Sequence, residues 1–89
     1  MSEMSVLREQ MKGAIGTSEG LKKLMGILEP GQIALAMSLY NVSNKGDELV
    51  GKRVAGELVR SLTDKQKSSL SGVLGHELYG RLLRFSGVA

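Results

Sequence analysis

The chain has 89 residues and a formal net charge of +3, with one histidine and no cysteine or tryptophan. The lack of cysteine excludes a disulfide scaffold and fits a cytoplasmic protein. No apolar run approaches the roughly 18–20 residues of a membrane span, and the first residues lack the pattern of a secretory signal. We therefore expect one small domain over residues 1–89, located in the cytoplasm, with no membrane partner.

Residues 3–40 predict three helices. Apolar residues recur every three or four positions over residues 3–15 and again over 19–28, where Ser18 is a candidate N-cap. Pro30 cannot lie inside a helix, so the second helix should end near Glu29. Residues 32–40 are apolar on nearly every side, which predicts a central helix buried all round. Residues 41–46 are polar and are expected to form a loop.

Two further helices are expected after this loop. Asp47 is a good N-cap for a helix to about residue 61, in which Val50, Val54 and Leu58 recur every four residues. Thr63 and Gln66 have the spacing of a capping box, which predicts a helix from there to about residue 84.

The fold class that we expect is all-α, a compact bundle of four to five short helices around the apolar helix at residues 32–40. The side chains expected in its core are those of Leu7, Met11, Leu24, Leu28, Ile33, Leu35, Leu39, Val54, Leu58, Leu70, Leu74, Leu78 and Leu82.

Twelve glycines interrupt these helical patterns. Each glycine in a helix interior costs about 0.5–1 kcal/mol relative to alanine. Two interpretations stay open, because the glycines could end and bend helices or could let another helix approach closely. The second interpretation concerns Gly51, Gly56, Gly72 and Gly75.

A short sequence also recurs. Residues 47–54 (DELVGKRV) and 76–83 (HELYGRLL) share Glu-Leu, then glycine and a basic residue, 29 positions apart. Three identities in eight residues are also consistent with a chance recurrence of common helix residues, and two units are too few for a repeat array.

No pattern of residues points to catalysis. His76-Glu77 resembles the first half of a zinc-protease motif, but position 80 is glycine, so the second metal ligand is missing. Neither a phosphate-binding loop nor a nucleophile elbow is present. We expect a protein that is not an enzyme and that has no catalytic residues, metal, cofactor or small-molecule substrate.

These features favour a small regulatory or protein-binding module, such as an adaptor, a chaperone or an inhibitor of a larger assembly. Three aromatic residues are few for a core, so a homodimer or a heterocomplex is expected to supply missing stability. The candidate interface residues are Val50, Tyr79 and Phe85, because large side chains near a helix flank or chain end often anchor partners.

The alternative is a DNA-binding regulator with a loose helix-turn-helix around residues 32–61. Against it, Asp47 and Glu48 would open the recognition helix and repel phosphates. The basic candidates for nucleic acid are Lys22, Lys23, Lys52, Arg53, Arg81 and Arg84.

Overall fold

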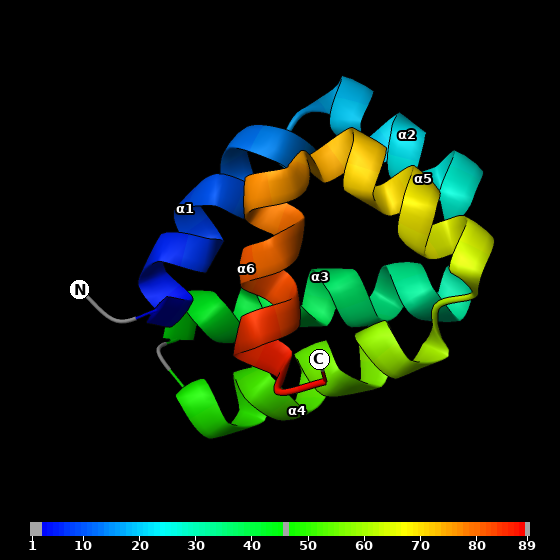
Figure 1. Cartoon of the computed structure of the whole chain (residues 1–89). Coiled ribbons are helices and arrows are strands. Elements are labelled where there is room, and N and C mark those ends of the chain that lie inside the picture. Colours follow the sequence, from blue (N-terminus) through cyan, green and yellow to red (C-terminus); the bar gives the residue numbers. More distant parts are fainter. Residues whose placement is uncertain (1–2, 46, 89) are drawn as a thin grey trace.

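The computed structural model describes residues 3–45 and 47–88, and the side chains of these residues except 3 and 43–45. The described residues form six helices (Figure 1). The all-α class is therefore confirmed, with one helix more than expected. In chain order the helices are α1 (Glu3–Ile15), α2 (Ser18–Ile27), α3 (Pro30–Lys45), α4 (Glu48–Ser61), α5 (Asp64–Leu74) and α6 (His76–Ser86).

The additional helix arises at Gly75. Residues 63–84 were expected to form one helix, but α5 ends at Leu74 and α6 begins at His76. Gly75 has φ +88° and ψ 154°, a conformation that is essentially restricted to glycine. The break lets α5 lie beside α2 while α6 runs past α1 to α4 (Figure 1). Of the two interpretations of the glycines, Gly75 therefore supports the helix end.

The bounds of α3 differ from the expectation. The helix starts at Pro30 instead of residue 32, because proline is tolerated in the first turn, where its missing N–H has no partner to lose. At its other end the helix continues through the polar residues 41–45, which were expected to be a loop. Helix α4 begins at Glu48, and α3 and α4 form an antiparallel hairpin (Figure 1). Residue 46, the last residue of the expected loop, lies outside the described residues.

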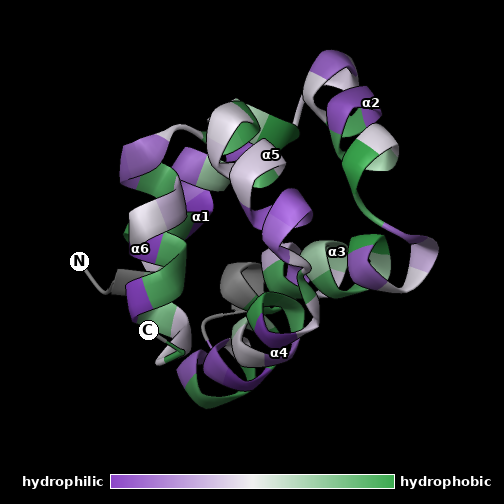
Figure 2. Ribbon diagram, turned by 45° about the vertical axis from the view of Figure 1, so that its right-hand side comes forward, coloured by the Kyte–Doolittle hydropathy of each residue, from purple (hydrophilic) through white to green (hydrophobic). Residues whose placement is uncertain are grey.

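The expectation that residues 32–40 are buried all round is also wrong. Ala36 and Leu39 are buried, but Ala34 is exposed and the side chain of Met37 is 41% exposed. Only one side of α3 faces the core, so α3 is an ordinary amphipathic helix. Hydrophobic and hydrophilic residues alternate around the other helices in the same way (Figure 2).

The buried side of α4 is shifted by one residue from the expected stripe. Gly51 and Ala55 face inward, whereas Val50 is exposed. A Cβ atom at Gly51 would lie 2.9 Å from the Met4 sulfur and 3.4 Å from a ring carbon of Phe85. Gly51 thus supports the interpretation of close helix packing, since its missing side chain makes room for α1 and α6.

The other two glycines considered for close packing differ from Gly51. A Cβ at Gly56 would lie 3.3 Å from the guanidinium of Arg60 in the same helix, and a Cβ at Gly72 would meet nothing within 4 Å. The nearest atoms at Gly56 belong to its own helix and Gly72 has no contact, so neither glycine shows the close approach of a second helix.

Three of the expected helix starts are capped by a side chain. Asp47 accepts a hydrogen bond from the Val50 amide, and Thr63 and Gln66 form the expected capping box. At the start of α2 the cap is Thr17 instead of Ser18, and its hydroxyl accepts from the Gly20 amide at 3.0 Å. Local patterns of this kind are visible in the sequence because cap and helix are only three residues apart.

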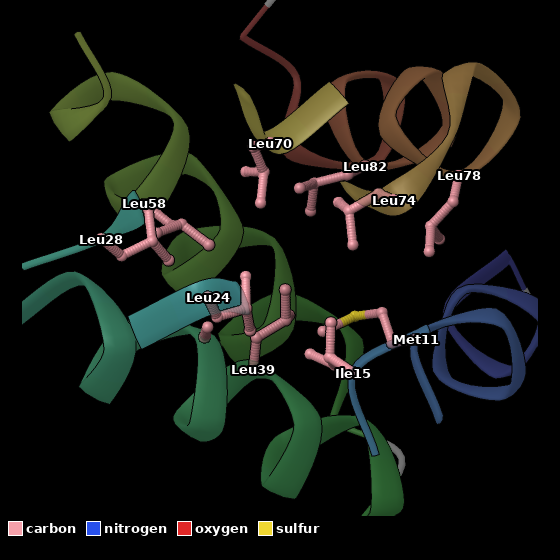
Figure 3. Close-up of a pocket in the computed structure, with 11 residues that line it drawn as sticks. Met11, Ile15, Leu24, Leu28, Leu39, Leu58, Leu70, Leu74, Leu78 and Leu82 are labelled. Carbon is pink, nitrogen blue, oxygen red and sulfur yellow. The ribbon is translucent and has the colours of Figure 1, made fainter. Parts of the chain in front are cut away.

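The core contains nine of the thirteen side chains expected there. The other four, Ile33, Leu35, Val54 and Leu74, are partly buried and pack against it. Figure 3 shows leucines of α5 and α6 facing Leu24 and Leu39 across a central space. The space measures about 20 Å³ and has only apolar walls, so it would take no more than one water molecule and should stay dry. The further buried residues are Met4, Ile15, Ala36, Ala55, Val59, Leu62 and Phe85.

Two glutamines tie four helix ends together. The side-chain amides of Gln32 and Gln66 donate to each other's oxygen at 3.0 and 2.7 Å. Gln66 also donates to the Ile27 carbonyl at 3.1 Å, and Gln32 donates to the Ser61 carbonyl at 2.9 Å. The end of α2, the start of α3, the end of α4 and the start of α5 therefore meet at one polar cluster.

Candidate interaction surface

A groove lies between the α1–α2 corner and α3. It has a volume of about 320 Å³, and its apolar walls are Ile15, Leu21, Met37 and Tyr40. The polar turn at residues 16–18 closes one side of the groove. Hollows of this kind, apolar with a few polar groups at the edge, are typical of ligand-binding sites.

The position of the groove depends on a tight corner. A Cβ atom at Gly20 would overlap the carbonyl oxygen of Ala14, so only glycine lets α2 start against the end of α1. The corner turns Leu21 of α2 towards Met37 and Tyr40 of α3, which line the same groove.

A second apolar surface is the first turn of α4. Leu49 is 81% exposed and Val50 is 41% exposed. Leu49 precedes the inward-facing Gly51 by two residues, which is about 200° around the helix, and this places Leu49 on the opposite side. We call the segment at residues 47–50 the α4 ridge.

The structure places the three candidate interface residues differently. Val50 is exposed, as expected, and Tyr79 is half-buried, so that desolvation raises the pKa of its phenol. Phe85 was expected at the surface but is only 1% exposed, because it packs over Gly51 in the core. This candidate is therefore corrected: Phe85 cannot anchor a partner while the domain is folded.

Sequence reasoning missed the more exposed apolar residues. Leu49, Met25 and Met37 are more exposed than Tyr79, and none of them was a candidate. For Leu49 a signal existed in the sequence. If Gly51 is counted as an inward position together with Ala55 and Leu58, Leu49 falls on the outer side of the helix.

The basic candidates do not form one surface. Lys22 and Lys23 lie on α2, which packs on α1, α3 and α5, whereas Lys52 and Arg53 lie on α4, which packs on α3 and α6. Both views place α2 and α4 at opposite ends of the molecule (Figures 1 and 2).

The two candidates on α6 differ in exposure. Arg84 is exposed, whereas Arg81 is half-buried with its guanidinium 3.9 Å from Glu77.

His76 is exposed at the start of α6. Within residues 3–45 and 47–88 there is no group of three or more His, Asp or Glu side chains that could hold a metal ion. In the same part of the chain, no helix is both long and apolar enough to cross a bilayer.

Comparisons with protein-family models, with curated proteins and with solved structures give no match to this chain.

Proposed function

We propose that this chain is a small, non-enzymatic protein-binding module whose binding site is the groove between the α1–α2 corner and α3. The observation that carries the proposal is the gathering of Ile15, Leu21, Met37 and Tyr40 around one open hollow. Apolar residues that line a surface hollow can receive apolar side chains of a partner, for example those on one face of an amphipathic helix. An adaptor, a chaperone or an inhibitor of a larger assembly would act in this way, and a cytoplasmic location fits the absence of cysteine.

The residue types in the groove suit this role. Methionine is unbranched and polarisable, so an exposed Met37 can adapt to side chains of different shapes. Tyr40 combines a flat apolar ring with a polar hydroxyl, a combination that is enriched at interfaces. The hydroxyl of Ser18, at the edge of the groove, would orient the partner's backbone.

Selection of peptides from a random display library tests this proposal, because such a library offers the groove side chains of every class. We expect peptides with apolar anchors to be enriched on the wild-type protein and to be lost on Met37→Glu, which puts a charge into the groove. Met25→Glu is the matched control, because Met25 is an exposed methionine that does not line the groove. Failure to enrich any peptide, or equal loss in both variants, would contradict the proposal.

DNA binding is the second candidate function. The observation in its favour is that Lys52 and Arg53 are adjacent and exposed on α4, but Asp47 and Glu48 at the start of this helix would repel phosphates. A titration with duplex DNA at low and moderate salt separates the two candidates. Binding that fades as salt rises and is lost in a Lys52→Glu/Arg53→Glu variant would favour DNA over protein as the ligand.

A further inference from the structure

We propose that the side-chain amides of Gln32 and Gln66 couple two equivalent helical units, so that the loss of either glutamine releases a helix start in both units. One unit consists of α2 and α3, and the other consists of α4 and α5. We call the two side chains the amide pair. The coupling that it provides does not depend on what binds in the groove.

The two units share a sequence pattern at the turn between their helices. The pattern is leucine, leucine and glutamine, each four residues apart, and it recurs after 34 positions, in Leu24, Leu28 and Gln32 and in Leu58, Leu62 and Gln66. All four leucines are buried. In each unit the second leucine is the extended residue that ends the first helix, and the glutamine is the third residue of the next helix. The two units therefore make the same turn with the same three residue types.

The contacts between the two units are reciprocal. Gln32 Nε2 donates to the Ser61 carbonyl at 2.9 Å, and Gln66 Nε2 donates to the Ile27 carbonyl at 3.1 Å. Ile27 and Ser61 are equivalent positions, because each is the last residue of the first helix in its unit. In the same exchanged way, α3 packs on α4 and α5 packs on α2. Both turns lie at one end of the molecule (Figure 1). Such reciprocity is that of an isologous interface, so a local two-fold axis passes between the two amides.

The amide pair uses the full hydrogen-bonding capacity of both side chains. Each oxygen accepts from the backbone N–H directly before its own helix, at Glu29 for Gln32 (2.9 Å) and at Thr63 for Gln66 (3.0 Å). Each oxygen also accepts from the other amide, and each nitrogen donates to the other amide and to a carbonyl of the other unit. A primary amide has two donors and two acceptor positions, whereas a carboxylate has no donor. Because the bonds of such a network support one another, the helix start of each unit depends on the glutamine of the other.

Hydrogen exchange at two backbone amides tests this coupling. The Ile33 amide donates to the Glu29 carbonyl and the Lys67 amide donates to the Thr63 carbonyl, both at 2.9 Å. Each amide therefore reports on the first turn of α3 or of α5. Gln66→Ala should raise the exchange rate by about tenfold at both amides. If Gln66 only capped its own helix, the rate would rise at Lys67 alone, and that result would overturn the coupling.

Gln66→Glu separates the coupling from capping. Glutamate serves in a capping box as well as glutamine does, but its carboxylate cannot donate to the Ile27 carbonyl. We therefore expect exchange at Ile33 to rise as it does in Gln66→Ala, and an unchanged rate at Ile33 would leave capping as the whole role of Gln66. The matched control is Asn41→Asp, which makes the same chemical change at an exposed amide of α3 outside the amide pair. It should leave both rates unchanged.

A third amide detects a general loss of stability. The Tyr79 amide donates to the Gly75 carbonyl at 3.0 Å in α6, outside both units. Its exchange rate should rise less in Gln66→Ala than the rates at Ile33 and Lys67. An equal rise at all three amides would show that the substitution weakens the whole domain, and the specific coupling would then be wrong.

Urea unfolding of Gln32→Ala, Gln66→Ala and the double variant gives an independent check. Each single variant should lower the unfolding midpoint by a similar amount, because the two glutamines make equivalent contacts. The double variant should lose clearly less than the sum of the two, because the first substitution already breaks the amide pair. Losses that add in full would show two independent helix caps and overturn the coupling.

Discussion

The first turns of α4 and α6 have similar sequences and opposite orientations. Glu-Leu-x-Gly followed by a basic residue lies near the start of both helices, at residues 48–52 and 77–81. In α4 the leucine, Leu49, is 81% exposed and the glycine is buried, whereas in α6 Leu78 is 5% exposed and Gly80 is half-buried. The same pattern therefore presents opposite sides to the core.

The surroundings of the two glycines explain the difference. Gly51 is covered by Met4 and Phe85, so α1 and α6 pack where its side chain would be. Gly80 meets only the guanidinium of Arg84 in its own helix. A glycine in an amphipathic helix can thus mark either its buried or its open side, and only the packing partner decides which.

The largest expected effect is a difference in stability between variants of Leu78 and Leu49. Leu78→Ala should lower the free energy of unfolding by about 2–5 kcal/mol, because it leaves a cavity in the core. Leu49→Ala should change it by no more than about 0.5 kcal/mol, because the side chain is in solvent. Urea unfolding of the two variants, at a concentration where the protein is monomeric, checks the difference. Similar losses in both would show that α4 packs on a different side from the one described.

The next largest effect is a difference in stability between variants of Gly51 and Gly80. Gly51→Val should cost about 1–3 kcal/mol of stability, because the added methyl groups must displace Met4 and Phe85. Gly80→Val is the matched control and should be nearly neutral, since only the flexible Arg84 lies near. Thermal unfolding measures both. The comparison fails if Gly80→Val is the more harmful change.

The two helix starts also differ in how they are capped. The N-cap of α4 is the Asp47 side chain, whereas the N-cap of α6 is Gly75, which makes no side-chain hydrogen bond. Asp47→Ala should cost about 1 kcal/mol. Gly75→Ala should cost about 1–3 kcal/mol, because alanine is strained at a φ of +88°. Asp47→Asn keeps an oxygen acceptor and should restore most of the loss, which chemical denaturation would show.

The smallest effect concerns Tyr79, which takes the place of Val50 in the α6 sequence. Burial raises the pKa of the Tyr79 phenol in the folded protein, whereas in the unfolded chain the phenol ionises at about pH 10. The neutral phenol therefore contributes a stabilisation that is fully present below that pH and is lost as the pH rises towards the folded-state pKa. Tyr79→Phe should remove this part of the alkaline loss in unfolding experiments at about pH 8 and about pH 11. Parallel losses in wild type and variant would contradict it.

Local features of this fold could be predicted from the sequence. The caps at Asp47 and Thr63 and most of the leucine core follow from spacings of three or four residues. The sequence does not show that the helix continues through Gly72 and breaks at Gly75. Both positions are glycine, and they differ only in the backbone angles that the structure gives them.

The candidate site was less predictable than the fold. Its groove joins Ile15 and Leu21 to Met37 and Tyr40, residues that come together only after the α1–α2 corner has packed on α3. Phe85 was expected at the surface because it lies near the chain end, but its ring is buried in the core and packs over Gly51. Contacts of this kind depend on tertiary packing, which no periodicity in the sequence encodes.

The paired amides of Gln32 and Gln66 hold the base of the α3–α4 hairpin, where the two helices meet α2 and α5. The α4 ridge lies at the other end of the same hairpin. The two ends of the hairpin are therefore held by different kinds of contact, hydrogen bonds between side-chain amides at its base and the packing of Met4 and Phe85 on Gly51 near the ridge.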